Sequence, residues 1–459
     1  MELRHAALDG LDWNGRKALV MQLVRAALDA VDPYAAVRQA LRTEGDHLEV
    51  GGRTYDLSRY RRVIVVGGGK ASAPMAVAVE DALGGRVSAG LVNVKYGHVL
   101  PSEGRAPATR VIEINEAGHP IPDERGVEGA RRMAELLGSA DGDDLVICLI
   151  SGGGSALMAL PVEGVTLGDK QQLTDLLLRC GATINEMNAV RKHLSLSKGG
   201  GWARLAQPAD VIALILSDVV GSPLDVIASG PTAPDTSTFA DAWWVLQKYQ
   251  LVDQVAPAIR ERLQRGVEGL VEETPGPEDE LFRKVNNVVI GSNEIAARAA
   301  LRKAEELGFN VMLLSTYVQG EAREVARVMA AVAKEIVHSG SPVPRPACVI
   351  AGGETTVTIR GAGKGGRNQE LALAAAVEVD GLEDVVIVGA ATDGNDGPTD
   401  AAGAIASGAT VSRAWTLGLD ARKLLSDNNS HELFGKLGDL IVTGPTNTNV
   451  NDLTLVLVF

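Results

Sequence analysis

Short apolar runs rich in β-branched residues, each followed by Gly, Ser or Asp, constrain the fold of this chain most. In the first half they occupy residues 63–66, 89–94, 110–114, 145–150 and 211–216. Strands that are buried on both faces read as continuous apolar runs, whereas half-exposed strands alternate. Helix-like stretches separate the runs, so the sequence predicts an α/β fold with a parallel sheet covered by helices.

The second half repeats this pattern, which predicts a second α/β domain. Strand-like runs follow at 287–290, 311–314, 347–351 and 385–388, and residues 453–459 are expected to form a closing strand. The first fifty residues have helical periodicity, and a polar, acidic stretch covers 264–280. A chain of 459 residues exceeds one ordinary core. We therefore expect an N-terminal domain over 1–245, a linker region over 246–284 and a C-terminal domain over 285–459.

Composition narrows the class of partner. The formal charge of -14 and the aromatic content of 3% argue against a nucleic-acid binder. Three cysteines share no CxxC spacing, which favours free thiols in a reducing compartment. The N-terminal residues lack a signal-peptide core, and the uncharged stretch 145–162 is interrupted by Gly and Pro. We expect a cytoplasmic protein without a membrane span.

The turn after the first run reads Gly67-Gly68-Gly69-Lys70-Ala71-Ser72. Glycines let the backbone approach a phosphate, and the N-terminus of the following helix favours an anion. Lys70 adds a full positive charge. The turn misses the third glycine of GxGxxG and is not a Walker A loop. A tight turn with a solvent-exposed lysine explains this motif equally well.

The turn after residues 145–150 contains Ser151, Gly152, Gly153, Gly154 and Ser155. Three glycines between two serines, leading into a helix, are typical of an anion-binding turn. A nucleophilic serine is the rival interpretation. The order SGGGS does not match the GxSxG elbow, so we favour phosphate binding.

Asp218 follows the run 211–216 directly, and Asp225 lies a few residues further on. A carboxylate in this position can bind Mg²⁺ or accept a proton from a substrate hydroxyl. Capping of a helix N-terminus is the alternative role for these aspartates.

A glycine-rich segment precedes Arg367 and Asn368, and Glu354 lies upstream of it. Arginine presents a planar fork that binds a carboxylate or phosphoryl group through two parallel hydrogen bonds. Four glycines in the six residues before Arg367 favour a functional role for its guanidinium.

A further Gly/Asp-rich turn contains Asp393 and Asp396. Carboxylates beside a phosphate site suit Mg²⁺, although a metal-free cluster of Asx turns explains the same pattern. His119, Lys192 and His193 are secondary candidates, because a lone histidine near a strand end is more often structural.

Together and in this order, the segments resemble the class II glycerate 2-kinase family, whose C-terminal domain is of the leucine-rich MOFRL type. The resemblance runs from GGGKAS to TGPTNTNVNDL. It implies a Rossmann-like N-terminal domain, an active site in the cleft between two domains, and ATP-dependent conversion of D-glycerate to 2-phosphoglycerate with a divalent metal. It places the catalytic lysine on Lys70 and the catalytic arginine on Arg367. Relatives commonly have an aspartate where this chain has Ser222, which favours Asp218 and Asp225 as carboxylates.

The resulting hypothesis is a kinase in which Lys70 and the SGGGS turn bind ATP phosphates. Mg²⁺ would be held through Asp218 or Asp393, Arg367 would bind the glycerate carboxylate or the transferring group, and Asp218 could accept the hydroxyl proton. An NAD(P)H-dependent hydroxypyruvate reductase and a non-catalytic sugar-acid or nucleotide sensor are the alternatives. The oligomeric state, including a homo-oligomer, stays open.

Overall fold

The computed structural model describes residues 8, 10–99 and 109–459; residues 1–7, 9 and 100–108, within the expected first domain, lie outside it. The chain divides into two compact units. Pro33–Ile290 form the unit that we call the Rossmann-like unit, and Met1–Asp32 with Gly291–Phe459 form the C-terminal unit. Each unit is described by itself.

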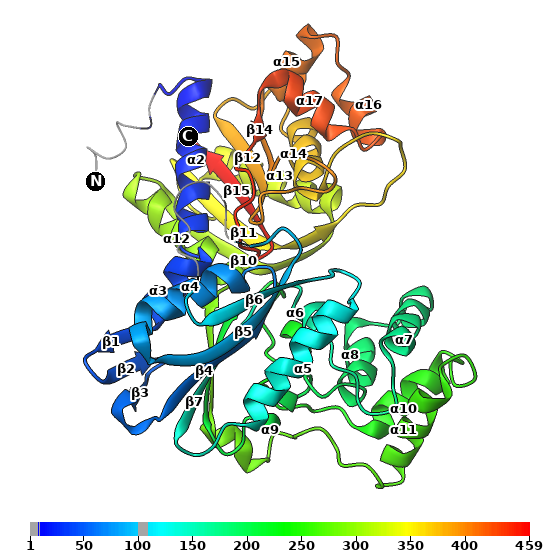
Figure 1. The fold of residues 1–459 in the computed structure, drawn as a ribbon. Coiled ribbons are helices and arrows are strands. Elements are labelled where there is room, and N and C mark those ends of the chain that lie inside the picture. Colours follow the sequence, from blue (N-terminus) through cyan, green and yellow to red (C-terminus); the bar gives the residue numbers. More distant parts are fainter. Residues whose placement is uncertain (1–7, 9, 100–108) are drawn as a thin grey trace. The chain divides into compact units, whose positions relative to one another are not determined.

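A six-stranded sheet forms the centre of the Rossmann-like unit (Figure 1). Its spatial order is β6 (Ile112–Ala117), β5 (Val87–Lys95), β4 (Arg62–Gly68), β7 (Asp144–Ile150), β8 (Asp210–Leu216) and β9 (Val285–Gly291). The four pairs from β6 to β8 are parallel. In chain order this is 3-2-1-4-5-6, the order of dinucleotide-binding sheets. The α/β prediction is confirmed.

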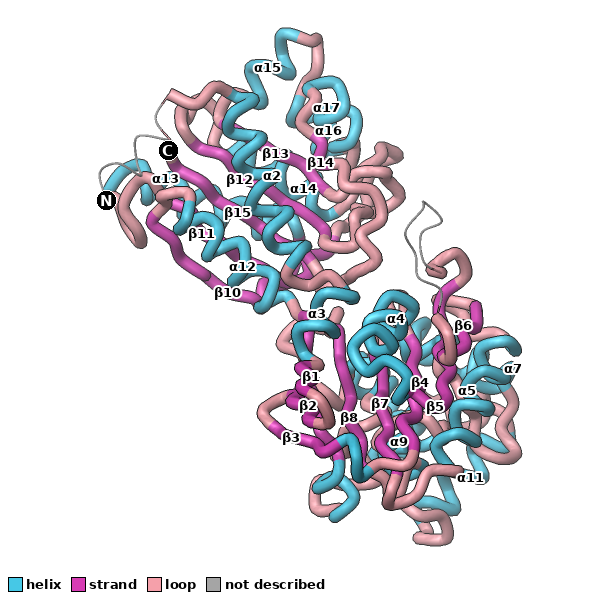
Figure 2. Tube along the Cα trace, turned by 60° about the vertical axis from the view of Figure 1, so that its left-hand side comes forward, coloured by secondary structure: helices cyan, strands magenta, loops and turns pink. Residues whose placement is uncertain are grey.

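Helices cover both faces of this sheet, as the continuously apolar strands require. α5 (Glu124–Gly138) and α9 (Gly201–Leu205) pack on one face, where Val66, Cys148 and Ala213 are buried. α4 (Ser72–Leu83) covers the other face (Figure 2). The short α6 (Gly154–Leu157) begins in the turn after β7.

A group of four helices in the same unit has its own apolar core, built from α7 (Leu167–Arg179), α8 (Ile184–His193), α10 (Phe239–Lys248) and α11 (Pro257–Val267). Thr166, Thr183 and Thr238 start α7, α8 and α10 with capping boxes. The expected linker 246–284 therefore differs from the structure: Leu246, Ile259 and Leu263 are core residues of this group.

A small antiparallel sheet follows α3 (Pro33–Ala40) and consists of β1 (Arg42–Glu44), β2 (His47–Val50) and β3 (Arg53–Asp56). The helical periodicity of the first fifty residues predicted helices where β1 and β2 lie. Leu48 and Val50 are buried and alternate with exposed residues, which is a strand pattern that we missed. Among the described residues of this unit, 3₁₀ helices lie at Leu57–Arg59, Gly84–Arg86, Ile227–Ser229 and Glu280–Lys284.

The C-terminal unit contains a second six-stranded sheet. Its order is β10 (Asn310–Glu321), β11 (Ala347–Thr356), β15 (Asp452–Val458), β12 (Val385–Ala391), β13 (Gly403–Ser407) and β14 (Leu440–Ile441). β15, expected as a closing strand, lies between β11 and β12 and is antiparallel to both. All seven of its residues are buried, so it is a central strand.

Helices pack on both faces of this sheet as well. α13 (Ala322–Ser339) and α14 (Arg367–Glu378) lie on one face, and α12 (Asn293–Glu306) lies on the other with α2 (Trp13–Asp29) (Figure 2). α15 (Thr410–Thr416), α16 (Ala421–Ser426) and α17 (Ser430–Leu437) pack beside β13. The apolar stripe of α2 packs on α12, so the expected first domain loses its first helix to the C-terminal unit.

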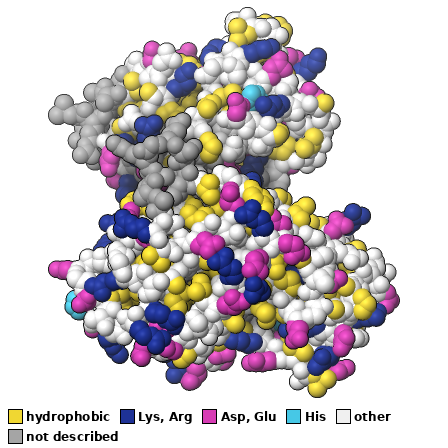
Figure 3. All heavy atoms as spheres, in the orientation of Figure 1, with side chains coloured by type: hydrophobic (Ala, Val, Ile, Leu, Met, Phe, Trp, Pro, Cys, Tyr) yellow, Lys and Arg dark blue, Asp and Glu magenta, His cyan; other side chains and the backbone are white. Residues whose placement is uncertain are grey.

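None of the described helices has the length and apolar character needed to cross a bilayer. Over the described part of the face drawn in Figure 3, basic and acidic side chains are interspersed. That face therefore presents no continuous basic stripe of the kind that binds nucleic acid.

Candidate functional site

Two glycine-containing turns lie next to each other at the carboxyl edge of the Rossmann-like sheet. They follow β4 and β7, which are neighbouring parallel strands with Gly68 aligned to Ile150. After β4 the chain continues to β5 on one side, and after β7 it continues to β8 on the other. The strand order reverses here, and open α/β sheets bind ligands at such a point.

Hydrogen bonds join residues 67–72 and 151–155 into what we call the paired glycine turns. The backbone N–H of Lys70 donates to the Gly152 carbonyl oxygen (2.9 Å), and that of Ala71 donates to the Ser151 hydroxyl (3.1 Å). Gly69 has φ +149°, and a Cβ atom there would lie 2.6 Å from the Ser151 carbonyl oxygen. Only glycine permits this approach, so the close contact between the two turns explains the glycine at position 69.

Three predicted side chains gather at the paired glycine turns. A Cβ atom on Gly152 would lie 2.9 Å from Cγ of Asp218. A Cβ atom on Gly153 would lie 3.0 Å from Nε2 of His119 and 3.5 Å from Cγ of Lys70. The structure therefore brings the side chains of Lys70, His119 and Asp218 close to the buried Gly152 and the half-buried Gly153.

His119 is half-buried near Lys70 and Lys95, and its pKa is lowered to about 4. Burial lowers the pKa most, and the positive charge of Lys70 lowers it further. At neutral pH the imidazole is uncharged, so it can exchange hydrogen bonds with a ligand but adds no positive charge.

Lys198, which the sequence analysis missed, is bound to the second glycine turn. Its ammonium group donates to both the carbonyl oxygen and the hydroxyl of Ser155, each at 2.7 Å. Lys170 and Arg191 line the same cavity of about 230 Å³. The sequence signal that could have identified Lys198 is the basic cluster at 191–198. Gly199-Gly200-Gly201 follow this cluster and resemble the other glycine turns in composition.

Lys192 and His193 have partners within the protein. The ammonium group of Lys192 lies 3.1 Å from Oδ1 of Asp235 and 3.4 Å from Oδ2 of Asp225. The imidazole of His193 contacts the Ala189 carbonyl oxygen (2.7 Å) and Oε2 of Glu273 (3.0 Å). These contacts support structural roles for the two side chains, and Asp225 is oriented toward Lys192.

In the C-terminal unit, Arg367 is the first residue of α14. Its guanidinium binds Glu354 (2.7 Å) at the end of β11, and Asp452 (2.6 Å) at the start of β15. Burial lowers the pKa of Arg367, but the two carboxylates outweigh it and raise the pKa above its usual value. Burial also raises the pKa of Asp452 to about 6, against the opposing effect of Arg367. The guanidinium is charged and held in one orientation.

Asp396 anchors the beginning of the same helix. Its carboxylate accepts the backbone N–H groups of Asn368 (3.0 Å) and Gln369 (2.8 Å), together with both side-chain amides. Burial raises the pKa of Asp396. Asp396 and the buried Asn368 therefore fix the position from which Arg367 extends.

The metal prediction depends on Asp218 and Asp393, which belong to different compact units. Oδ1 of Asp393 accepts the backbone N–H of Asn395 (3.0 Å), as in an Asx turn. Within residues 8, 10–99 and 109–459, no group of three or more His, Cys, Asp or Glu side chains is arranged to hold a metal. Mg²⁺ bound to phosphates needs only one or two carboxylates, and Asp218 beside Gly152 fits this mode.

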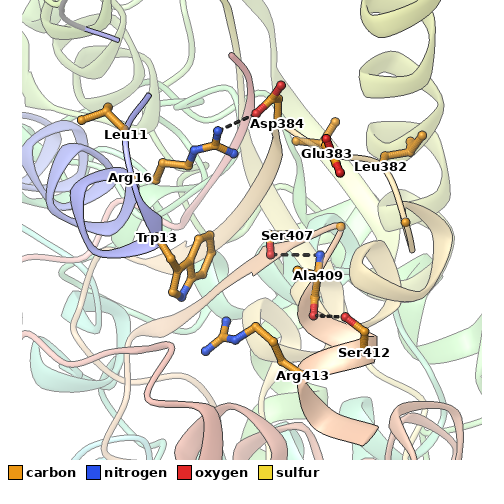
Figure 4. A pocket seen from close by; sticks show the side chains of 13 residues that line it. Leu11, Trp13, Arg16, Leu382, Glu383, Asp384, Ser407, Ala409, Ser412 and Arg413 are labelled. Carbon is orange, nitrogen blue, oxygen red and sulfur yellow. Dashed lines mark hydrogen bonds and ion pairs between the residues drawn. The ribbon is translucent and has the colours of Figure 1, made fainter. Parts of the chain in front are cut away.

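A larger cavity of about 470 Å³ lies in the C-terminal unit, beside Trp13 (Figure 4). Its basic residues are neutralised by carboxylates: Arg16 binds Asp384 (2.5 Å) and Arg413 binds Asp439 (2.7 Å). No predicted site residue lines this cavity, so we do not assign it to the reaction.

Comparison with known proteins defines the family. Residues 19–264 match the family described as "Domain of unknown function (DUF4147)", and residues 347–452 match the MOFRL family. The chain is 43% identical to "Glycerate 2-kinase" of Pyrococcus horikoshii (95% of this chain, 96% of the relative). It is also 43% identical to "D-glycerate 2-kinase" of Thermotoga maritima (97% of this chain, 99% of the relative).

The structural comparison agrees with the sequence comparison. The crystal structure of glycerate kinase from Thermotoga maritima superposes with a TM-score of 0.86 at 42% identity, covering 97% of this chain and 100% of that one. At this coverage the match spans both compact units. The chain belongs to the glycerate 2-kinase family with a C-terminal MOFRL domain.

Proposed function

We propose that this protein transfers the γ-phosphoryl group of ATP to the 2-hydroxyl of D-glycerate, giving 2-phospho-D-glycerate and ADP. The observation that carries the proposal is the pair of glycine turns with Lys70 at the reversal point of the sheet. Membership of the glycerate 2-kinase family supplies the substrate and the position of the hydroxyl.

In this proposal the paired glycine turns let phosphate oxygens approach the backbone closely, and Lys70 supplies positive charge. The backbone N–H groups of Lys70 and Ala71 already donate between the two turns. Mg²⁺ would neutralise phosphate charge, with Asp218 as its protein ligand and Asp393 as the second candidate. Phosphoryl transfer depends chiefly on positioning and on neutralising charge. Arg367, held by Glu354 and Asp452, is suited to bind the transferring group or the acid.

The hydroxyl proton of glycerate leaves as the oxygen–phosphorus bond forms. Asp218 is the carboxylate that we assign to accept it, because it lies against Gly152 in the second turn. His119, uncharged at neutral pH, can donate or accept a hydrogen bond at the same place.

The reductase alternative receives little support from the sheet. Dinucleotide-binding sheets carry an acid at the end of the second strand, where it binds the ribose. Here β5 ends in Asn93-Val94-Lys95. The nearest acids upstream, Glu80 and Asp81, lie in α4. The Glu80 carboxylate accepts the backbone N–H groups of Arg110, Val111 and Ile112, and the Asp81 carboxylate accepts the hydroxyl of Tyr34 (3.0 Å). A sensor without activity would have no need of an arginine, Arg367, whose guanidinium is held by Glu354 and Asp452.

We place the reaction in the cytoplasm, where ATP is available and thiols stay reduced. Three cysteines are free, at Cys148, Cys180 and Cys348, and the first and last are buried. A homo-oligomer remains a prediction to be tested by light scattering.

The test is ³¹P NMR of the purified protein with D-glycerate, ATP and Mg²⁺. We expect a 2-phosphoglycerate signal that is lost in Lys70→Met and Arg367→Gln but kept in Arg327→Gln, an exposed arginine of α13. The shape of the product signal distinguishes the 2-phosphate from the 3-phosphate. Oxidation of NADH by hydroxypyruvate without consumption of ATP would overturn the proposal in favour of the reductase.

A further inference from the structure

We propose that the cavity lined by Lys170, Arg191 and Lys198 binds the carboxylate of the hydroxy-acid substrate. The identity of that acid as D-glycerate rests on the proposed function. We call this space the basic cavity.

The basic cavity is built by several elements of the Rossmann-like unit. Lys170 comes from α7, Arg191 from α8, and Lys198 from the segment before α9. The cavity has a volume of about 230 Å³ and is completed by Gly153, Ser155 and other residues: His119, Pro120, Pro122, Ala156, Ala159, Leu167 and Thr174. It therefore opens directly on the second glycine turn, where we place the ATP phosphates.

The positive charges in the basic cavity are not balanced by the protein. No Asp or Glu lines it, and among the described residues neither lysine nor Arg191 forms an ion pair with a carboxylate. Lys170 donates to the Leu194 carbonyl oxygen (3.1 Å), and Lys198 donates to Ser155. Nearby Lys192 shows the opposite arrangement, because Asp235 and Asp225 neutralise it.

Because the basic side chains of this cavity are buried, their unbalanced positive charge is unfavourable. Lys170 and Lys198 are both buried. Burial, followed by the charge of Arg191, lowers the pKa of Lys170 to about 7. Burial likewise lowers the pKa values of Lys198 and Arg191. An uncompensated buried cation is unfavourable, and an anionic ligand relieves the cost.

The size of the basic cavity favours a small acid over a nucleotide. Pockets for drug-sized ligands occupy about 300–1,000 Å³, so a cavity of about 230 Å³ suits a three-carbon acid. Ala156, Ala159 and Leu167 supply apolar wall, and Arg191 supplies a planar fork that fits a carboxylate. With the carboxylate in this cavity, the 2-hydroxyl of the acid lies toward the turn formed by Gly153 and Ser155.

The test compares Arg191→Gln with the matched control Arg179→Gln, an exposed arginine at the end of α7. Binding of D-glycerate is measured by calorimetry, and KM values for D-glycerate and ATP are measured separately. We expect Arg191→Gln to weaken D-glycerate binding about 10–100-fold and to leave KM for ATP within about twofold, since loss of one charge-assisted contact has this size. Arg191→Lys should recover part of the affinity, and glycerol should bind far more weakly than D-glycerate to the wild type.

The outcomes separate this inference from the proposed function. An Arg191→Gln enzyme with a raised KM for ATP and unchanged D-glycerate affinity would assign the cavity to phosphate and overturn the inference. Unchanged D-glycerate affinity in a folded Arg191→Gln protein that still makes 2-phosphoglycerate would also overturn it, while the proposed function stands. D-glycerate binding that depends on Arg191 in a protein without kinase activity would support the inference and refute the proposed function. A wild type that binds no D-glycerate would refute the inference directly.

Discussion

Replacement of Lys170 by methionine should stabilise this protein. Lys170 is 8% exposed, and its pKa is about 7 against an ordinary value of 10.5. At about 1.4 kcal/mol for each pKa unit, this difference makes the charged form unfavourable in the fold by about 5 kcal/mol. Methionine keeps the length and apolar stem but loses the hydrogen bond to Leu194, which costs about 1–3 kcal/mol because the buried carbonyl oxygen is left unsatisfied. We expect a net gain of about 2–4 kcal/mol at or below pH 7.

The pH dependence of this gain tests its origin. Because the folded-state pKa is lower than the unfolded-state pKa, the unfolded protein binds more protons between about 7 and 10.5. Wild-type stability therefore rises with pH across this window, and the advantage of Lys170→Met is largest at or below pH 7 and shrinks toward pH 10.5.

Differential scanning calorimetry of the full chain at pH 6, 7 and 9.5 measures the effect. For the Rossmann-like unit, the gain corresponds to a Tm increase of about 4–8 °C at pH 6. The matched control is Lys192→Met, which removes the partner of buried Asp235 and should destabilise by about 3–5 kcal/mol. A lower Tm for Lys170→Met at pH 6, or a Tm difference that does not change with pH, would refute the reasoning.

The affinity for D-glycerate should fall as pH rises above about 7, because Lys170 loses its charge beside Arg191 and Lys198. His119, with a pKa of about 4, stays neutral in that range and does not contribute to the change. Calorimetry from pH 6 to 9 checks the trend. Gly69→Ala should destabilise by about 2 kcal/mol or more in urea unfolding, since its Cβ atom would lie 2.6 Å from the Ser151 carbonyl oxygen at φ +149°; an unchanged midpoint would contradict the account of the paired glycine turns. Arg367→Lys should reduce kcat at least about 10-fold, because lysine cannot reproduce the planar fork; near-normal kcat would remove the role given to the guanidinium.

Much of the fold could be predicted from the sequence, because strands buried on both faces have a strong local signature. The runs before Gly67 and Ser151 became β4 and β7 with small changes at their ends. β1 to β3 were missed, since these strands have only three or four residues each. The boundaries of the compact units depend on α2 packing against a helix nearly three hundred residues away, and no local pattern encodes that contact.

The candidate site was predictable where chemistry and turn geometry coincide. Lys70 and Arg367 stand beside glycines, and the structure gives each a defined setting. Lys198 and Lys170 were not singled out, because a lysine inside an amphipathic helix or loop looks like an ordinary surface residue. Their burial and lack of carboxylate partners are visible only once several helices are assembled.

The central position of β15 has a consequence for the order in which the two sheets can form. β11 and β12 each pair with this strand, which follows both of them in the sequence. Until β15 has been synthesised, those two strands lack their shared neighbour and expose unpaired backbone edges. The strands of the Rossmann-like sheet are complete by residue 291. The Rossmann-like sheet can therefore form earlier in synthesis than the C-terminal sheet, and loss of β15 would remove the middle of that sheet rather than trim an edge.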